Sequence, residues 1–340
     1  MSNEKIGICV VGAGRAGLIH IHNFARVVPE ARLVAVVDPV QDSAKKAAKQ
    51  YAVPNYYSDY RGALEDGDID AVVVAAPTAY HRDIVIAAAD AGKHILCEKP
   101  MAMDVSECEA MNDAAKKNRV KLQIGFMRRF DRNFLAAKEK IKEGIIGDVV
   151  LIKSLTHGPS IPQRWQYDVG KSNGPLAEVN SHDIDTLRWF SESEFELVYA
   201  IAGNYRCQDV RDEFPDYYDS FILSASFVNG MQGFIDGAAA VRYGYDMRVE
   251  VLGTKGVLFV GQLQENSVVT CNQDEGMVKS VVGSWRNLFA EAYLAEDTDF
   301  VRCILEDSEP RVTGFDGKMA VKVVNAGNLS IKQKRPVNLD

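Results

Sequence analysis

Lys99 stands where a charged side chain could reach a bound ligand. It belongs to the motif Cys-Glu-Lys-Pro at 97–100, directly after a short apolar run at 95–96. Proline lacks a backbone donor and favours extended geometry in the residue before it, so Lys99 is expected to leave its strand in a defined direction. In an open α/β sheet, ligands bind outside the carboxyl ends of the strands. An ammonium group there would stabilise negative charge that develops on a reacting oxygen.

A second group of polar side chains falls on one stripe of a predicted helix. Glu178, His182 and Asp185 follow the i, i+4, i+7 spacing that stacks side chains on one face. Asn180 and Asp183 are expected to point elsewhere. Burying two acids and a histidine without partners is costly, so the stripe is a candidate site. Histidine, with an unperturbed pKa of about 6.5, is suited to accept a proton near neutral pH.

Simpler interpretations stay open for several of these side chains. The stripe could be a solvated helix face on which Asp185 and Arg188 pair at i, i+3. His81 could be a histidine at a helix start, and His157 a loop residue beside Gly158. The spacing alone does not decide between these interpretations and a functional site.

A glycine-rich segment near the N-terminus predicts a nucleotide-binding turn. It has the GxGxxG pattern, follows a predicted strand and opens a predicted helix. The first glycine permits the tight turn, the second lets backbone N–H groups reach a pyrophosphate, and the third allows close packing of helix and strand. The candidate cofactor-binding residues of this turn are Gly12, Ala13, Gly14, Arg15, Ala16 and Gly17.

Asp38 lies at the end of the second predicted strand, about twenty residues after the glycine turn, where the fingerprint requires an acidic residue. Its carboxylate is expected to accept hydrogen bonds from the adenine-ribose hydroxyls. A carboxylate repels a 2′-phosphate, and Pro39 and Val40 supply no arginine to compensate, so NAD is predicted and NADP is disfavoured. Asp38 could also cap the helix that begins near Gln41, and the two roles can coexist.

The first third of the chain predicts a doubly wound α/β domain. Apolar runs rich in β-branched residues alternate with amphipathic stretches, a pattern typical of buried parallel strands and their crossover helices. Asp104 and Glu107 resemble a capping box. The fold class is therefore an α/β Rossmann domain with a six-stranded parallel sheet, whose predicted strands include 6–11, 33–37, 71–75, 94–97 and 121–126.

The pattern of alternating strands and helices changes after about residue 125. Alternating runs at 195–203, 220–228, 232–239, 247–252 and 256–260 predict an open, mainly antiparallel sheet in an α+β domain. Asn229-Gly230 predicts a hairpin with a type I′ turn. Helical stretches are predicted near 133–143, 176–190, 285–306 and 315–331. We therefore divide the chain into an NAD-binding domain, 1–124, and a substrate-binding and oligomerisation domain, 125–340, whose last segment is able to pack back on the first.

Composition narrows the function classes. A chain of 340 residues with 47 % apolar and 25 % charged residues fits a two-domain globular enzyme. A net charge of −8 gives no electrostatic reason to bind nucleic acid or an anionic membrane. The N-terminus lacks the apolar core of a secretory signal and no run is long enough to span a bilayer, which predicts a cytoplasmic protein. Six scattered cysteines without a CxxC pair favour neither a metal site nor disulfides.

The ordered set of motifs resembles a known family. The motifs are Gly17-x-x-His20, Ala75-Ala76-Pro77-Thr78-x-x-His81, Glu98-Lys99-Pro100, Gly125-Phe126-Met127-Arg128-Arg129-Phe130-Asp131 and His182-x-x-Asp185. Together with the glycine fingerprint, this motif set resembles the glucose-fructose oxidoreductase, inositol dehydrogenase and rhizopine catabolism (Gfo/Idh/MocA) family. The resemblance runs from residue 5 to about 190 and becomes generic in the C-terminal sheet.

The resemblance implies roles for individual residues. Lys99 would be the catalytic lysine and His182 the proton-transferring histidine, while Glu178 stands where inositol dehydrogenases have an aspartate. That extra methylene moves the carboxylate by about a bond length, a displacement that costs rate in a tightly positioned site. The implied walls of the nicotinamide pocket are Ala76, Pro77, Thr78, His81, Glu98 and Met127. The implied substrate contacts are Asp185 and His157, with Trp165 and Arg128 as further candidates.

The expected function is NAD-dependent oxidation of a ring secondary alcohol in a cyclitol or pyranose sugar, with His182 as base and Lys99 stabilising the alkoxide. Two alternatives stay open: an NAD-retaining glycoside hydrolase that uses transient oxidation, and an inactive NAD-binding regulator. A homodimer or homotetramer is expected because an open sheet presents a broad face that needs covering. An acidic or phosphorylated substrate is a further alternative, because arginines 128, 129 and 164 could bind an anionic group.

Overall fold

The computed structural model describes residues 5–339, which form two compact units. The first unit contains the chain up to Phe130 together with Ala290–Val321, and the second contains Asp131–Phe289 together with the chain from Lys322 onward. A segment distant in sequence, Ala290–Val321, therefore completes the N-terminal unit.

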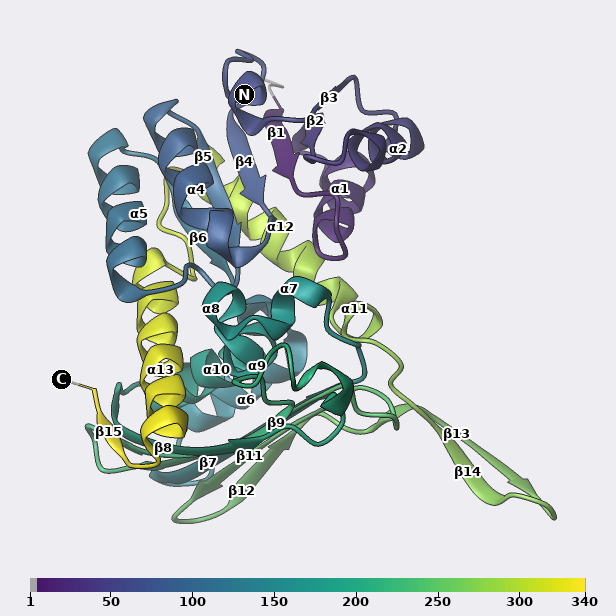
Figure 1. Ribbon diagram of the computed structural model, residues 1–340, viewed down its shortest axis with the longest axis vertical. Coiled ribbons are helices and arrows are strands. Elements are labelled where there is room, and N and C mark those ends of the chain that lie inside the picture. The colour runs from purple at the N-terminus through teal and green to yellow at the C-terminus, as the bar shows by residue number, and fades with distance from the viewer. Residues whose placement is uncertain (1–4, 340) are drawn as a thin grey trace. The chain divides into compact units, whose positions relative to one another are not determined.

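The first unit contains a parallel sheet with strand order β3-β2-β1-β4-β5-β6, and helices lie on both of its faces (Figure 1). This arrangement confirms the predicted Rossmann domain. Its two central strands are buried except at Ile6, the first residue of one of them, which explains their runs of valine and isoleucine. The short strand β3 lacks such a run and was not predicted. The strands are β1 (Ile6–Val11), β2 (Ala31–Val37), β3 (Asn55–Tyr57), β4 (Ala71–Val74), β5 (His94–Glu98) and β6 (Leu122–Gly125).

Two helices of this unit begin with a side-chain cap: Asp59 caps the helix that begins at Tyr60, and Asp104 caps the helix that begins at Val105. Asp104 accepts a hydrogen bond from the Glu107 backbone N–H at 2.9 Å, but the Glu107 side chain bonds the Met103 N–H, so the predicted capping box is shifted by one residue. The elements are α1 (Gly17–Arg26), α2 (Gln41–Tyr51), α3 (Tyr60–Leu64), η1 (Thr78–Tyr80), α4 (His81–Asp90), α5 (Val105–Asn118), η2 (Met127–Phe130) and α12 (Ala290–Leu305). The long helix α13 (Gly314–Gln333) starts in this unit and continues into the second.

The second unit contains a seven-stranded sheet with order β12-β11-β7-β10-β9-β8-β15. All neighbours pair antiparallel except β7 and β10, so the predicted mainly antiparallel sheet is confirmed. The central strand β7 was not predicted because its alternation is interrupted by polar residues on both faces. The strands are β7 (Val149–Gly158), β8 (Phe195–Gly203), β9 (Ser220–Phe227), β10 (Gln232–Ala239), β11 (Asp246–Gly253), β12 (Val257–Val260) and β15 (Val337–Asn338).

The turn between β9 and β10 departs from the predicted type. The hairpin forms, with Gly230 N–H donating to Phe227 C=O at 2.8 Å. Gly230 has a φ of +84°, whereas Asn229 is not among the residues with positive φ. A type I′ turn needs positive φ at both central residues, so that prediction is wrong. The loop instead has its one left-handed residue after the turn.

Helices cover one face of the second unit's sheet, and the opposite face carries none of its described helices (Figure 1). The helices that lie wholly in this unit are α6 (Arg132–Lys142), α7 (Arg164–Tyr167), α8 (Val169–Ser172), α9 (Gly174–Glu178), α10 (Ser181–Ser191), η3 (Gln208–Val210) and α11 (Trp285–Leu288). No helix within residues 5–339 has the length and apolar character needed to cross a membrane.

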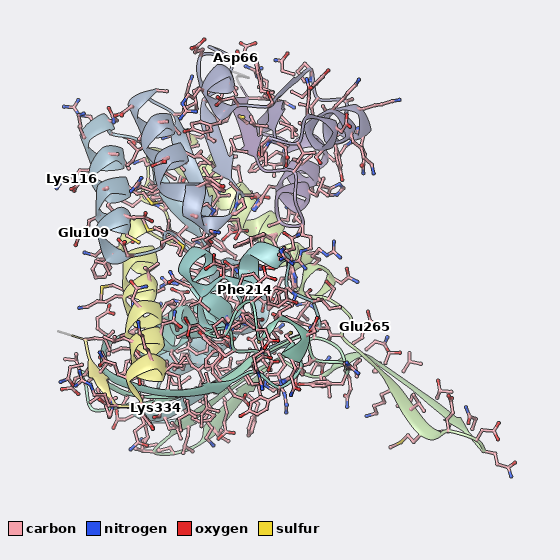
Figure 2. The ribbon with its side chains drawn as sticks, viewed as in Figure 1. Asp66, Glu109, Lys116, Phe214, Glu265 and Lys334 are labelled. Atoms are coloured by element: carbon pink, nitrogen blue, oxygen red, sulfur yellow. The ribbon has the colours of Figure 1, made fainter. Side chains whose placement is uncertain are left out.

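A separate two-stranded ribbon, β13 (Gln264–Asn272) and β14 (Gly276–Val281), projects from this sheet (Figure 1). Every residue of both strands is exposed. Figure 2 labels Glu265 at the base of the ribbon, where side chains stand out from both strands. This ribbon was not predicted from the sequence.

Candidate active site

The glycine turn of the first unit has the tight geometry that its sequence predicts. Gly12 has a φ of +107°, and a Cβ atom there would lie 2.5 Å from the Ala75 carbonyl oxygen. A Cβ atom on Gly17 would lie 1.8 Å from the Gly12 carbonyl oxygen. Gly14 has no atom within 4 Å of such a position. The first and third glycines are therefore required by the fold, while the second leaves open space, which fits a turn that admits a pyrophosphate.

Asp38 braces this turn from the end of β2. One carboxylate oxygen accepts from the Ala13 N–H at 2.9 Å, and the other accepts from the Val40 N–H at 2.9 Å. Helix α2 has Val40 at its N-cap position with no side-chain cap, so the capping role considered for Asp38 is wrong. The carboxylate ties the second strand to the first loop, while Arg15 in that loop is exposed.

His81 joins the loops that follow β4 and β5. Its side chain is buried, with Nε2 2.7 Å from the Ala76 carbonyl oxygen and Nδ1 3.0 Å from the Pro100 carbonyl oxygen. Burial lowers the pKa of His81, which keeps the ring neutral, so one of these two contacts carries a donated hydrogen bond. Thr78 is also buried, and Pro77 stands at the N-cap of its short helix. The imidazole thus fixes two loops at the carboxyl edge of the sheet.

Lys99 leaves β5 at this same edge. Its backbone N–H donates to Oε2 of Glu98 at 3.0 Å, and the Glu98 side chain is buried whereas Lys99 is only partly so. Met127 and Arg128, in η2 after β6, are each about 1 % exposed. The lysine therefore lies where the sequence predicted it, at the carboxyl end of a strand of the parallel sheet.

The second unit divides the predicted acidic stripe between two helices. Helix α9 ends at Glu178 and α10 begins at Ser181, so the prediction of one continuous helix through Glu178, His182 and Asp185 is wrong. The Asn180 N–H still reaches the Pro175 carbonyl at 3.2 Å, and the Asn180 carbonyl then starts α10 by accepting from Ile184. The break changes the direction of Glu178 relative to the histidine. Its carboxylate accepts from Gln166 Nε2 at 3.1 Å.

His182 and Asp185 lie on a helix that is buried nearly all round. Their side chains are 6 % and 1 % exposed, so the solvated-face interpretation is wrong. Arg188 donates to Glu194 through Nε at 2.7 Å. Within α10, the histidine carbonyl accepts from Thr186 Oγ1 at 2.8 Å. An imidazole and a carboxylate one turn apart in a buried helix are suited to hold a hydroxyl-rich ligand and move a proton.

A buried polar network beside His182 was missed by the sequence analysis. Asp183 is fully buried; it accepts from Thr156 Oγ1 at 3.0 Å, from Asn180 Nδ2 at 2.9 Å and from the Ser154 hydroxyl. Asn180 and Asp183 thus bond each other in the core of the second unit, and Asp183 also bonds β7. The available signal was the pair of hydroxyls on Ser154 and Thr156, which are spaced two residues apart and therefore lie on the same face of the strand.

His157 lies on β7 and not in a loop, which corrects that alternative. Its Nδ1 lies 2.5 Å from the Tyr243 hydroxyl and its Nε2 lies 3.1 Å from an Asp236 carboxylate oxygen. Because strand side chains alternate, His157 faces the side of the sheet opposite to Thr156, which contacts α10. The structure therefore does not bring His157 to the face that carries Asp185.

Trp165 and Arg164 belong to the short helix α7. The indole Nε1 donates to Gln163 Oε1 at 2.9 Å, and Arg164 pairs with Glu213. In the first unit, Arg129 pairs with Asp316 at 2.9 Å. Two of the three arginines that left an acidic substrate open are thus neutralised by carboxylates. Among residues 5–339, no group of three or more histidine, cysteine or acidic side chains could hold a metal ion.

Comparison with known families decides the assignment. The oxidoreductase family model described as an NAD-binding Rossmann fold matches residues 6–126, and the model for the C-terminal alpha/beta domain of the same family matches residues 138–339. The chain belongs to the Gfo/Idh/MocA oxidoreductase family. This confirms the family indicated by the motifs.

Relatives resemble the chain over its whole length. A myo-inositol 2-dehydrogenase of Thermotoga maritima is 32 % identical over 333 residues, covering 98 % of each chain. A scyllo-inositol 2-dehydrogenase (NAD(+)) of Bacillus subtilis is 32 % identical, covering 99 % of this chain and 97 % of the relative. The solved scyllo-inositol dehydrogenase of Lactobacillus casei with bound NAD(H) and scyllo-inositol has a TM-score of 0.90 at 28 % identity, covering 99 % of both chains.

Proposed function

We propose that this protein is an NAD-dependent dehydrogenase that oxidises a ring secondary alcohol of a cyclitol. The observation that carries this proposal is the position of Lys99, directly after β5 at the carboxyl edge of a sheet whose first turn has dinucleotide-binding geometry. The inositol dehydrogenases among its full-length relatives support the substrate class.

The cofactor fits the residues present. The space around Gly14 and the backbone N–H groups at the start of α1 would hold the pyrophosphate, and Asp38 would hold the adenine ribose. When bound, NAD supplies the hydride acceptor. The Asp38 carboxylate would oppose a 2′-phosphate, which supports a preference for NAD over NADP.

The protein's side chains would supply proton transfer, charge stabilisation and substrate binding. His182 would take the proton of the reacting hydroxyl, and the Lys99 ammonium would stabilise the negative charge that develops on that oxygen. Glu178 would orient the substrate or the histidine. Asp185 would accept hydrogen bonds from neighbouring hydroxyls, and Trp165 would cover an apolar face of the ring. A polyol suits such a set better than an apolar alcohol, because an apolar alcohol leaves buried polar groups unpaired.

A neutral substrate is favoured over an acidic one. Arg129 and Arg164 are each engaged by a carboxylate of the chain itself, and Arg128 is buried. An anionic ligand would have to displace one of these partners.

We also propose that the uncovered face of the second unit's sheet forms an interface between copies of the chain. Ile201 on β8 pairs directly with Ile222 on β9, and both are about half exposed, while Phe259 on β12 is 73 % exposed. Exposed apolar side chains on one sheet face are typical of protein interfaces. Sedimentation of the purified protein tests this, with a dimer or tetramer expected and a monomer contradicting it.

A substrate panel tests the catalytic proposal. We expect NADH to form with one or more inositol isomers, more slowly with aldoses and least with sugar acids. Lys99→Ala should reduce turnover to a small residual rate and keep NAD binding. Release of an aglycone from a glycoside without net NADH would favour a hydrolase, and no turnover with any substrate would favour a regulator.

A further inference from the structure

A chain of buried charged groups runs from helix α12 to Lys99. Nδ1 of His20 lies 2.7 Å from Oδ1 of Asp297, and Nε2 of His20 lies 3.2 Å from Oε1 of Glu98. The other Glu98 oxygen, Oε2, accepts from the Lys99 backbone N–H at 3.0 Å. Asn23 donates to the second oxygen of Asp297 at 2.8 Å. His20 and Asp297 are fully buried and Glu98 is 4 % exposed, so water does not compete for these bonds.

Both ring nitrogens of His20 face carboxylate oxygens, and carboxylates only accept hydrogen bonds. A neutral imidazole has one donor, so satisfying both contacts requires the imidazolium. Burial lowers the pKa of His20, but Asp297 and Glu98 raise it by more, and it lies well above 6.5. The histidine is thus a cation held between two anions, and it contacts the Glu98 oxygen that does not bond the Lys99 N–H.

Gly125 on the neighbouring strand β6 completes the enclosure of Glu98. A Cβ atom on Gly125 would lie 3.2 Å from Cα, Cδ and Oε2 of Glu98. The glycine therefore leaves just enough room for the carboxylate beside the strand. Any larger residue would displace it by a few tenths of an ångström.

We propose that Asp297 and His20 are positioning residues for the reaction, acting through Glu98 to fix the point and direction at which Lys99 leaves β5. This inference rests on the proposed function, in which Lys99 stabilises the developing alkoxide. The proposal also assigns a role to α12, a helix near the C-terminal end of the sequence that belongs to the nucleotide-binding unit. His20 stands in α1, directly after the glycine turn, so the same helix start that would bind the pyrophosphate also anchors the lysine.

The test compares His20→Gln and Asp297→Asn with His94→Gln. His94 is a matched control because it lies at the start of the same strand and accepts the Lys121 backbone N–H at 3.0 Å, without contact to Glu98. We expect His20→Gln and Asp297→Asn to lower kcat for the cyclitol by about 10-fold to 100-fold, the scale of a misplaced catalytic group, with KM for NAD within about 3-fold. His94→Gln should leave kcat unchanged.

A double mutant separates positioning from a general structural role. In a Lys99→Ala background, adding His20→Gln should cause no further loss of the residual kcat, because its effect runs through Lys99. Multiplicative losses in the double mutant would overturn the proposal. Should His20→Gln fail to fold, Gly125→Ala provides a milder displacement of Glu98 and should lower kcat in the same way.

A measurement without substrate keeps this proposal separate from the proposed function. Lysines of the folded protein are reductively methylated with ¹³C, and the Lys99 resonance is identified by its absence in Lys99→Arg. We expect that resonance to shift in His20→Gln and to stay in place in His94→Gln. An unshifted resonance in a folded His20→Gln variant would overturn the positioning role even if the wild type oxidises inositols. A shifted resonance in a protein that oxidises no alcohol would overturn only the proposed reaction.

Discussion

The carboxylate of Asp183 accepts a hydrogen bond from the Thr156 hydroxyl at 3.0 Å, which ties the helix that carries His182 to the central strand β7. Asp183 is fully buried, and Asn180 and Ser154 bond it as well. A buried carboxylate with several donors holds its helix in one register, because any shift would leave the charge unsolvated.

Thr156→Val is expected to lower the free energy of unfolding by about 1–3 kcal/mol, the scale of a hydrogen bond to a charged group. Valine keeps the shape of threonine and removes only the donor. Thr298→Val is the control, because the Thr298 hydroxyl bonds a carbonyl of its own helix, and it should change stability by less than about 0.5 kcal/mol. Urea denaturation measures both, and equal effects would argue against a special role for Asp183.

The glycine turn predicts opposite results for two alanine substitutions. Gly17→Ala places a Cβ atom 1.8 Å from a backbone oxygen and should destabilise the first unit strongly. Gly14→Ala meets nothing within 4 Å, so the protein should fold normally and bind NAD at least about 10-fold more weakly, because the new methyl group occupies the approach to the pyrophosphate. Calorimetric titration gives the Kd, and wild-type affinity in Gly14→Ala would place the pyrophosphate elsewhere.

Asp38→Asn separates the charge of this side chain from its bracing role. The amide oxygen retains an acceptor for the Ala13 N–H, so the fold should persist. Loss of the charge should reduce the preference for NAD over NADP by about 10-fold in kcat/KM, because the repulsion of the 2′-phosphate disappears. Asp42→Asn, on the exposed start of α2, is the control and should leave the ratio unchanged. A wild type that prefers NADP would contradict the assignment.

Stability should fall as the pH rises from neutral. Burial lowers the pKa of His20, but Asp297 and Glu98 raise it by a larger amount. The folded protein therefore retains a proton that the unfolded chain releases near pH 6.5. The protonated His20 contributes its full stabilisation below pH 6.5. This stabilisation is lost as the pH rises through the higher pKa that His20 has in the folded protein. Urea denaturation between neutral and alkaline pH should show this decline, and His20→Gln should flatten it. A wild-type curve that rises over this range would contradict the charge state of the network.

Glu296 strengthens the same trend. Both of its carboxylate oxygens are buried without a hydrogen-bond partner in the described part of the chain, and burial, then Glu98, raise its pKa well above 4.5. A neutral carboxyl resembles an amide, so Glu296→Gln should be tolerated at pH 7, whereas Asp297→Asn should destabilise by breaking the pair with His20. Thermal unfolding compares the two variants, and equal losses would contradict the neutral state of Glu296.

Local sequence signals were sufficient for the elements with strong periodicity. The buried strands of the parallel sheet and the position of Lys99 followed from β-branched runs and from the proline after the lysine. The strands of the antiparallel sheet were also located to within a residue or two, except the two-residue strand β15 and the central strand β7, which has polar residues on both faces.

The features that could not be predicted depend on contacts between segments distant in sequence. The break between α9 and α10 arises where Asn180 bonds Asp183, and no local signal other than Asn180 itself marks it. The partnership of His20 with Asp297 spans most of the chain and requires knowing that α12 returns to the first unit. Hydrophobic periodicity describes one helix or strand at a time, so it does not predict contacts between residues of different elements.

Transfer of deuterium from substrate to cofactor tests the central claim most directly. The protein is incubated with NAD and inositol deuterated at its ring carbons, and the reduced cofactor is analysed by mass spectrometry. We predict NADH that carries one deuterium in the wild type and loss of that product in Lys99→Ala and His182→Asn. Deuterium-free NADH, or full transfer in both variants, would contradict the proposed dehydrogenase and the roles of these two residues.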